Sequence, residues 1–197
     1  MKKTKEVTEN TPKITTDKVL FFDMDGTLID TNLANFLSYN KAIESVTKLD
    51  FNLIYHTDKR FNRSDLKNSV PNLSETEYKK IIQEKENYYT EFLPQTKLIT
   101  KTVNILYKYA KTNKTVLVTN CREDRALTTL NYHDLDKTFS YIFCREKTDC
   151  GNRINKYTNA VNHLKISTKS IIVFENEQIE IDDALKAGIN ELNIIKI

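Results

Sequence analysis

Two aspartates, Asp23 and Asp25, follow a short apolar run and are separated by a single residue. Alternate residues of an extended chain face the same way, so both carboxylates project into one small volume while Met24 points in the opposite direction. Two such charges repel each other unless a cation or a proton lies between them. Hard oxygen ligands in a polar turn suit Mg²⁺. The spacing therefore predicts a magnesium site or a carboxyl group with a raised pKa, in a turn that Gly26 makes possible and from which Thr27 can cap the next segment.

These carboxylates stand at the end of the first of three continuous apolar runs, which cover residues 19–22, 115–119 and 170–174. Each run leads into a polar turn and then into helical periodicity, and the final NIIKI resembles a further strand. Continuous apolar strands that alternate with helices are typical of a parallel sheet covered on both faces. The expected fold class is therefore α/β.

Residues 30–114 contain no strand-like run and repeat their apolar side chains at helical spacing. Ser74 and Glu77 form a capping box that opens one helix, Pro94 ends that helix, and Thr96 starts the next one. Shorter helices are expected further on, over residues 125–130, 155–164 and 180–187, with Gly188 ending the last of them.

Composition excludes several classes of protein. Three glycines and three prolines in 197 residues are too few for a glycine-rich phosphate loop or a dinucleotide-binding fold. The 30 basic and 27 acidic residues are interleaved, and the only basic cluster is an N-terminal KKTK, so no nucleic-acid partner is expected. Three cysteines without CxxC spacing argue against a disulfide framework or a structural zinc site. No apolar run indicates a membrane span or a secretory signal, so we expect a cytoplasmic protein with no membrane partner and a disordered tail over residues 1–17.

The string FFDMDGTLID resembles the first signature of the haloacid-dehalogenase-like phosphohydrolase superfamily. The other signatures of that superfamily follow in order. TVLVTN, which ends in Thr119 and Asn120, is similar to the second signature. The third is a single basic residue, for which Lys156 is the choice because a helix follows it directly, with Lys147 and Arg153 as alternatives.

The fourth signature is matched by IIVFENEQIEIDDALKAGI, where Glu175 and Asn176 occupy the acidic pair and Glu180 the distal acid. Asn176 stands where the family usually has a metal-binding carboxylate. This departure weakens the expected metal site, because an amide oxygen can bind Mg²⁺ but brings no charge, whereas Glu175 beside it can supply one.

The resemblance implies a Rossmann-like core formed by residues 18–30 and 97–197, with a helical cap inserted over residues 31–96. It further implies that Asp23 attacks phosphorus to form an aspartyl-phosphate, that Asp25 acts as general acid and base, and that Thr119 and Lys156 hold developing negative charge. The implied Mg²⁺ ligands are Asp23, Asp25, Glu175 and Asn176. Gly26, Thr27 and Asn120 would contact the phosphate.

Within the cap, the loop HTDKRFNRSD gathers cationic side chains, and Arg60 is the residue expected to face an anionic substrate. A solvated loop around a buried Phe61 is the alternative. The function that these features favour is a Mg²⁺-dependent phosphatase of a small phosphorylated metabolite. A phosphomutase of the same fold and a non-catalytic binding module with a decayed metal site are the other hypotheses, and the sequence leaves the oligomeric state open.

Overall fold

A computed structural model describes residues 12–57, 59–146 and 153–197 of the chain. Its centre is a five-stranded sheet in the order β5-β4-β1-β6-β7, in which every pairing is parallel. The strands are β1 (Val19–Phe22), β4 (Lys114–Val118), β5 (Tyr141–Phe143), β6 (Ile171–Glu175) and β7 (Ile194–Lys196). The predicted parallel α/β sheet is therefore confirmed, with β1 in the middle.

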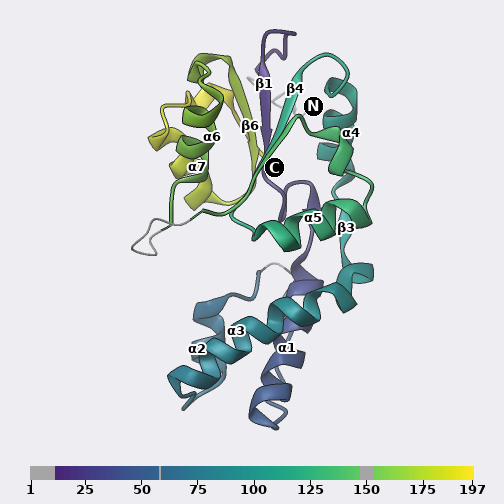
Figure 1. Cartoon of the computed structure of the whole chain (residues 1–197), viewed down its shortest axis with the longest axis vertical. Helices are drawn as coiled ribbons and strands as arrows, with labels where there is room; N and C mark the ends of the chain where they lie inside the picture. Colours follow the sequence, from purple (N-terminus) through teal and green to yellow (C-terminus); the bar gives the residue numbers. More distant parts are fainter. Residues whose placement is uncertain (1–11, 58, 147–152) are drawn as a thin grey trace, which may run out of the picture.

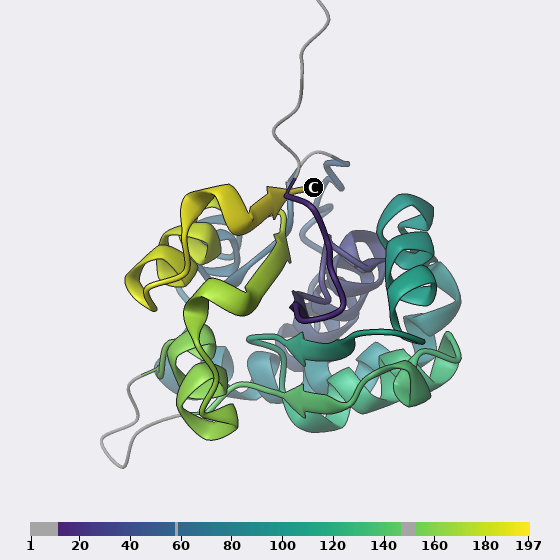
Figure 2. The ribbon, with the colours of Figure 1, turned by 90° about the horizontal axis from the view of Figure 1, so that it is seen from above.

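Helices cover both faces of this sheet, as Figures 1 and 2 show. Leu20 and Phe22 of β1 pack with the helices on one face, and Phe21 packs with those on the other. On the first face lie α4 (Thr100–Tyr109) and α5 (Glu123–Tyr132), and on the second lie α6 (Lys156–Leu164) and α7 (Gln178–Lys186). Because both faces are buried, β1 reads as a continuous apolar run.

A second layer of helices, which we call the cap (residues 31–96), lies beyond one end of the sheet (Figure 1). It consists of α1 (Asn32–Thr47), α2 (Arg63–Ser69), α3 (Glu75–Tyr89) and the 3₁₀ helix η1 (Thr90–Gln95). Its apolar centre joins α1 and α3 through Ile43 and Ile81. The expected capping box of Ser74 and Glu77 opens α3. None of the helices in the described ranges is both long and apolar enough to cross a membrane.

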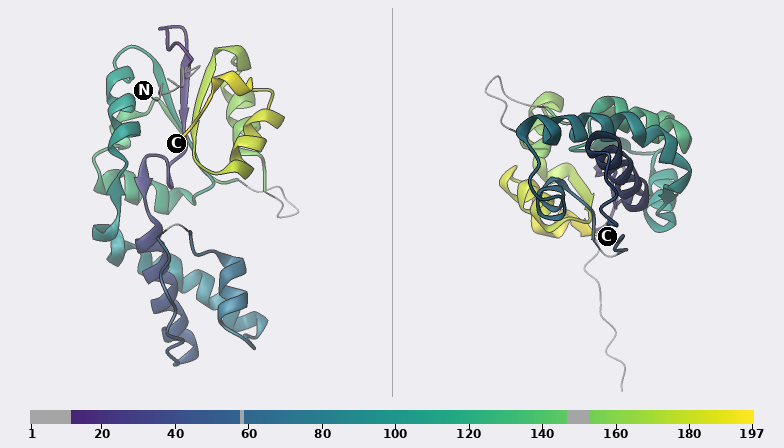
Figure 3. Two further views of the ribbon diagram at one scale, coloured as in Figure 1. Left: turned by 180° about the vertical axis from the view of Figure 1, so that it is seen from behind. Right: turned by 90° about the horizontal axis from the view of Figure 1, so that it is seen from below.

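Two short strands connect the cap to the core, and Figure 3 shows these connections from behind. β2 (Ile29–Asp30) enters the cap and β3 (Lys97–Leu98) leaves it, and the two pair antiparallel. The prediction of no strand between residues 30 and 114 was therefore wrong. Thr96 does not start a helix either: its buried hydroxyl bonds the Leu93 carbonyl, and α4 begins only at Thr100.

Other boundaries also differ from the predictions. Pro94 does not end α3, which stops at Tyr89, but lies inside η1. The end of the expected loop HTDKRFNRSD, residues 63–65, belongs to α2, because Asn62 and Asp65 make a reciprocal capping box that starts this helix. Strand β5, at the edge of the sheet, was not predicted, because its three residues are too few to form a recognisable apolar run. The remaining short 3₁₀ helices are η2 (Asp136–Thr138), η3 (Thr168–Ser170) and η4 (Glu191–Asn193).

The expected tail divides into two parts. Residues 1–11 lie outside the described residues, as do Lys147 and Cys150. Residues 12–17 contact the core: Asn113 Nδ2 donates to the carbonyl oxygens of Thr15 (2.7 Å) and Lys18 (2.9 Å), and Ile14 packs against the apolar cluster. The core therefore includes residues that the sequence had assigned to the tail.

Candidate active site

Asp23 and Asp25 lie in the turn that follows β1, at the carboxyl end of the sheet. Asp23 N donates to the Phe174 carbonyl oxygen (3.1 Å), so the chain is still held to β6 as it leaves the strand. Met24 is fully buried in the core, while both carboxylates line one cavity, as the alternation predicted. Gly26 turns the chain with a φ of +82°, a conformation that favours glycine.

Lys156, the first residue of α6, places its ammonium group between the carboxylates at the ends of β1 and β6. Nζ donates to Asp23 Oδ1 (2.7 Å) and Glu175 Oε2 (2.9 Å) and lies 3.5 Å from Glu180. Asn155 caps α6 with its side chain and so fixes where the helix begins. Burial lowers the pKa of Lys156, but the surrounding carboxylates outweigh this effect and raise it. The ammonium is therefore permanently charged.

Arg153, one of the alternatives to Lys156, faces a different set of groups. Its Nη1 donates to Glu180 Oε1 (2.8 Å), its Nη2 contacts Asp183, and its side chain is 41% exposed. It has no contact with Asp23 among the described residues. Lys156 is therefore the basic residue that the structure brings to Asp23.

The Asp25 carboxylate is surrounded by donors from three parts of the chain. Thr31 Oγ1 donates to Oδ1 (2.5 Å), and the guanidinium groups of Arg60 (3.1 Å) and Arg125 (3.2 Å) both contact Oδ2. Burial raises the pKa of Asp25, but the two arginines outweigh it and hold the pKa below its ordinary value. Arg60 was expected in the site, whereas Thr31 and Arg125 carry no motif and were missed.

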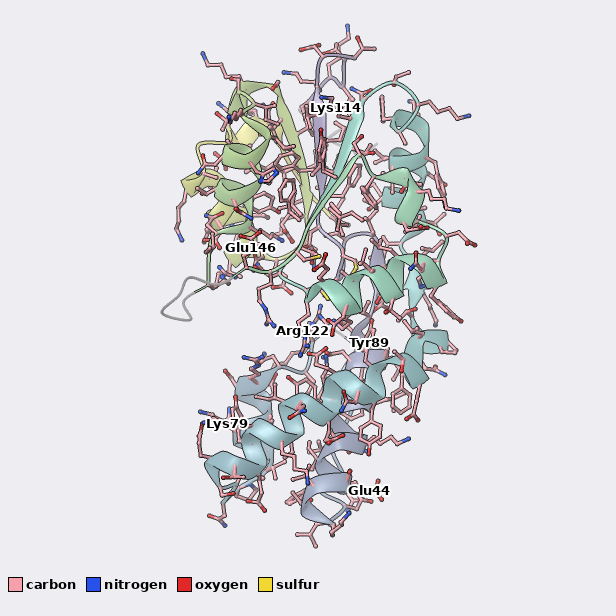
Figure 4. The ribbon with its side chains drawn as sticks, in the orientation of Figure 1. Glu44, Lys79, Tyr89, Lys114, Arg122 and Glu146 are labelled. Carbon is pink, nitrogen blue, oxygen red and sulfur yellow. The ribbon has the colours of Figure 1, made fainter. Side chains whose placement is uncertain are left out.

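Arg125 is held in place by other contacts of α5. Its Nε donates to Cys121 Sγ (2.8 Å), and its guanidinium lies 5.2 Å from the centre of the Tyr89 ring. Tyr89 belongs to the end of α3, and Figure 4 shows it where the cap meets the core. Arg125 thus contacts both parts of the molecule. Burial raises the pKa of Cys121 to about 12, so this thiol is not an activated nucleophile.

The residues after β4 form another wall of the cavity. Thr119 N donates to the Phe143 carbonyl (2.9 Å), and Thr119 Oγ1 accepts from Cys121 N (3.1 Å). Asn120 Nδ2 donates to Glu180 Oε2 (2.7 Å). Asn120 Oδ1 is buried without a hydrogen-bond partner among the described residues. Both Thr119 and Asn120 line the cavity.

Glu175, at the end of β6, is completely buried, and both of its carboxylate oxygens accept hydrogen bonds. Oε2 accepts from Lys156 and from the Tyr157 hydroxyl (2.7 Å), and Oε1 accepts from the main-chain amides of Asn176 (2.9 Å) and Glu177 (3.2 Å). This carboxylate therefore holds the turn after β6 and positions Lys156.

The Asn176 side chain lies against the turn that follows Asp25. In the amide orientation that satisfies its hydrogen bonds, Nδ2 donates to Thr27 Oγ1 (3.0 Å), the Asp25 carbonyl oxygen (3.1 Å) and Glu175 Oε1 (3.2 Å). A β-carbon on Gly26 would collide with this amide. Thr27 is fully buried against Asn176 and caps no helix, and neither Gly26 nor Thr27 lines the cavity in which phosphate was expected to bind.

The cavity has a volume of about 290 Å³ and lies between the core and the cap. Apart from Cys121, the residues that line it are polar, and they carry both signs of charge. The walls are formed by Asp23, Asp25, Arg60, Asn62, Thr119, Asn120, Cys121, Arg125, Lys156, Glu177 and Glu180. An anion small enough to enter would meet one ammonium and two guanidinium groups.

No group of three or more His, Cys, Asp or Glu side chains within the described part of the chain is placed to hold a metal ion. Of the four predicted ligands, Glu175 and the Asp25 carboxylate are already occupied by hydrogen bonds and ion pairs. The Oδ2 atom of Asp23 makes no hydrogen bond among the described residues and belongs to a carboxylate that lines the cavity. Asp23 Oδ2, the Asp25 carbonyl oxygen and the Asn176 amide oxygen remain as possible oxygen donors in this part of the structure.

Comparison with known proteins gives a consistent result. The family model described as haloacid dehalogenase-like hydrolase matches residues 20–194. Over 186 residues, the chain is 23% identical to the phosphorylated carbohydrates phosphatase of Thermotoga maritima. The matched region covers 89% of this chain and 83% of the relative.

Two solved structures share the fold. One, from Clostridium difficile and assigned as a phosphatase, has a TM-score of 0.71 at 20% identity and covers 91% of this chain and 84% of its own. The other is a hydrolase of the same superfamily from Bacillus subtilis, bound to magnesium, with a TM-score of 0.60 at 17% identity. The match covers 88% of this chain and 86% of that chain.

Proposed function

Because the chain belongs to the haloacid dehalogenase-like hydrolase family, we propose that it is a Mg²⁺-dependent phosphatase that hydrolyses a small phosphomonoester through an aspartyl-phosphate intermediate. The observation that carries this proposal is the pairing of Asp23 with Lys156. One carboxylate oxygen is held by the ammonium, whereas Oδ2 makes no hydrogen bond among the described residues and belongs to a side chain that lines the cavity. A nucleophile needs this combination of a fixed orientation and one free oxygen.

In the first half of the proposed reaction, Asp23 Oδ2 forms a bond to phosphorus while the bond from phosphorus to the leaving oxygen breaks. Asp25 enters this step protonated, with a proton that it takes from the phosphomonoester monoanion or keeps from the preceding turnover, and it gives that proton to the leaving oxygen, which departs as an alcohol. In the second half, Asp25 takes a proton from water, and the water oxygen attacks phosphorus and releases Asp23 with inorganic phosphate. Lys156 and Thr119 hold the phosphoryl oxygens while their negative charge develops.

The oxygen atoms that Asp23, the Asp25 carbonyl and the Asn176 amide present are of the kind that Mg²⁺ prefers. Asp23, the Asp25 carbonyl and Asn176 are the residues that would hold the ion, with Glu175 adjacent to them. When bound, the ion would neutralise the nucleophile and the phosphoryl oxygens. Asn176 provides no negative charge, so we expect weak Mg²⁺ binding.

The cap gives the site its selectivity under this proposal. A cavity of about 290 Å³ has the size that a small phosphorylated metabolite needs. Burial beneath the cap also removes bulk water, which strengthens every charge–charge interaction in the site. A cytoplasmic location remains part of the proposal, because the expected substrates are intracellular metabolites.

A phosphate-release screen over nucleotides, sugar phosphates, phosphoglycolate and pyrophosphate, with and without Mg²⁺, tests the activity. Rapid acid quenching with ³²P-labelled substrate tests the intermediate: the wild type should retain a protein-bound label that hydroxylamine removes, whereas Asp23→Asn should retain none. Formation of a sugar-phosphate isomer in place of free phosphate would indicate a phosphomutase. A wild type that releases no phosphate at any Mg²⁺ concentration would favour a non-catalytic binding module.

A further inference from the structure

A second cavity lies on the core between α4, the N-terminal residues 12–14 and the strands β6 and β7, and has a volume of about 750 Å³. Within the described part of the chain, it shares no lining residue with the cavity that holds Asp23 and Asp25. It is therefore separate from the candidate active site. We call it the basic groove and define it by its four lysines, Lys13, Lys101, Lys108 and Lys196.

The floor of the basic groove is apolar. Phe174 of β6 is fully buried, and its ring stacks on that of Phe22 with 4.5 Å between the ring centres. Ile14, Ile105 and Ile195 are half-buried and pack against the same apolar cluster of the core. Because these side chains are recessed in a cavity, they suit a ligand that enters the groove better than they suit a membrane surface.

The rim of the basic groove is cationic. All four lysines are exposed, and no Asp or Glu side chain is among the residues that line the groove within the described part of the chain. Lys101 and Lys108 are seven residues apart on α4, which places them on one face of the helix and about 10 Å from each other along its axis. Ile105 lies between them on that face. The groove thus joins an apolar surface to a net positive charge.

The fold fixes the walls of the basic groove. Asn113 Nδ2 donates to the carbonyl oxygens of Thr15 (2.7 Å) and Lys18 (2.9 Å), and these hydrogen bonds anchor the N-terminal wall. Another wall is β7, which pairs with β6 in the sheet. A preformed, largely apolar cavity of several hundred Å³ with a few polar groups is the usual form of a small-molecule site.

We propose that the basic groove binds a free amphiphile with an anionic head group and an unbranched apolar chain, the class to which fatty acids belong. Four ammonium groups attract the head group, and no carboxylate side chain in the described lining repels it. The apolar chain covers Ile105 and Ile195 and removes them from water. The same cations disfavour a second copy of this protein, because a two-fold interface at this face would bring the lysines of both copies together.

Calorimetry on the intact chain, below the concentration at which micelles form, tests the chemistry of the ligand. Dodecanoate should bind at a ratio of one per chain and about 10- to 100-fold more tightly than octanoate, because its additional methylene groups are buried. Dodecyltrimethylammonium has an equally long chain and the opposite charge, and it should bind about tenfold more weakly than dodecanoate. Equal affinities for these two ligands would overturn the proposal.

Two double variants with the same change in net charge assign the binding to the groove. Lys101→Gln combined with Lys108→Gln should weaken dodecanoate binding by about tenfold, since an exposed charge pair contributes up to about fivefold in affinity. Lys79→Gln combined with Lys80→Gln is the control, because both lysines are exposed on α3 of the cap, where Figure 4 shows Lys79 away from the core. The control should bind like the wild type. An equal loss in both double variants would indicate a general effect of net charge and overturn the proposal.

Tryptophan fluorescence locates the apolar chain of the ligand. The sequence contains no tryptophan, so Tyr109→Trp places the only indole in the groove, whereas Tyr132→Trp places it at a 48% exposed position of α5. The bromine of 12-bromododecanoate quenches an indole that it contacts, so it should quench the first variant and leave the second unchanged. Circular dichroism checks that both variants fold.

Two results of this experiment would overturn the proposal. An unquenched Tyr109→Trp variant is the result expected if residues 1–11 of the chain or a second copy of the protein occupies the groove. Binding to phosphatidylglycerol vesicles without quenching by free 12-bromododecanoate would assign the groove to a membrane surface.

Discussion

Lys156 Nζ lies 2.7 Å from Asp23 Oδ1, although 133 residues separate them in the chain. The contact exists because β1 and β6 are neighbours in the sheet, and because α6 begins beside their carboxyl ends. In open parallel sheets this edge is where ligands bind. The same contact supports several tests of the site.

Lys156→Met should abolish phosphate release and also destabilise the protein. The change leaves the buried carboxylates of Asp23 and Glu175 without their shared cation, and breaking a buried ion pair in this way costs about 3–5 kcal/mol. Chemical denaturation and a phosphate-release assay measure the two effects. Arg153→Gln is the matched control, and a larger loss of activity in that variant would transfer the role to Arg153.

Asp25→Asn should slow turnover by about 10²- to 10⁴-fold, the usual contribution of general acid–base catalysis. The amide keeps the shape of the side chain and removes its ability to exchange a proton. Single-turnover kinetics measure the change, and circular dichroism checks that the fold is retained. Near-normal turnover would show that another group moves the proton.

Asn176→Asp should tighten Mg²⁺ binding, because it adds a negative charge beside the Asp25 carbonyl and removes the amide donor that now contacts it. We expect the Mg²⁺ concentration for half-maximal activity to fall on the order of tenfold, which corresponds to about 1.4 kcal/mol. Direct Mg²⁺ titration by calorimetry gives a readout that does not depend on turnover.

Glu175→Gln should have the opposite effect on Mg²⁺ if Glu175 supplies the missing charge. Tyr157→Phe is its control, because it removes one hydrogen bond to Glu175 without changing the charge. Mg²⁺ midpoints that are unchanged in both Asn176→Asp and Glu175→Gln would place the metal elsewhere.

The cap should move relative to the core when ligand binds. Its two connections are the segments that carry β2 and β3, and each of these strands is two residues long. Hydrogen exchange over residues 29–32 and 92–98 should slow in the presence of inorganic phosphate and Mg²⁺. Equal exchange with and without these ligands would contradict a moving cap.

Stability should rise with pH between about 7 and 10 because of Lys85. Burial of this side chain in the cap lowers its pKa, and the charges of Arg125 and Arg60 lower it further. Glu86 and Asp25 raise the pKa, but the resulting value is still only about 7. In the unfolded chain the pKa is about 10.4. Between these values the unfolded state binds a proton that the folded state lacks, so the free energy of unfolding increases with pH.

Lys85→Met should therefore remove this pH dependence and raise Tm at pH 7. Each kcal/mol of added stability corresponds to about 2–4 °C for a chain of this size. The aromatic rings of Tyr39 and Tyr89, which now lie near Nζ, can pack against the methionine. Lys79→Met, at an exposed position of α3, should leave the profile unchanged, and parallel profiles for wild type and Lys85→Met would refute the assignment.

The sequence by itself determined the elements whose signals are local. Three of the sheet strands are continuous apolar runs, and the helices repeat apolar residues at helical spacing, so both followed from neighbours in the chain. The Asp23–Asp25 pair was identified for the same reason, since it stands directly after a strand, whereas the site residues at the ends of β4 and β6 were assigned by resemblance to the signatures of a family. Resemblance to a family supplied Lys156.

Only the tertiary structure decided which distant groups meet. Arg125 and Thr31 reach Asp25 because α5 and the start of the cap pack beside one strand end, and no residue spacing encodes that contact. Short elements such as β5 and α2 were missed since they bury too few apolar side chains to leave a periodic signal. The position of Asn176 also depends on packing, because its amide donates to the Asp25 carbonyl and the Thr27 hydroxyl, which are far away in the chain. Local patterns record which face of an element is buried, whereas the chemistry of a site depends on long-range contacts that no single segment contains.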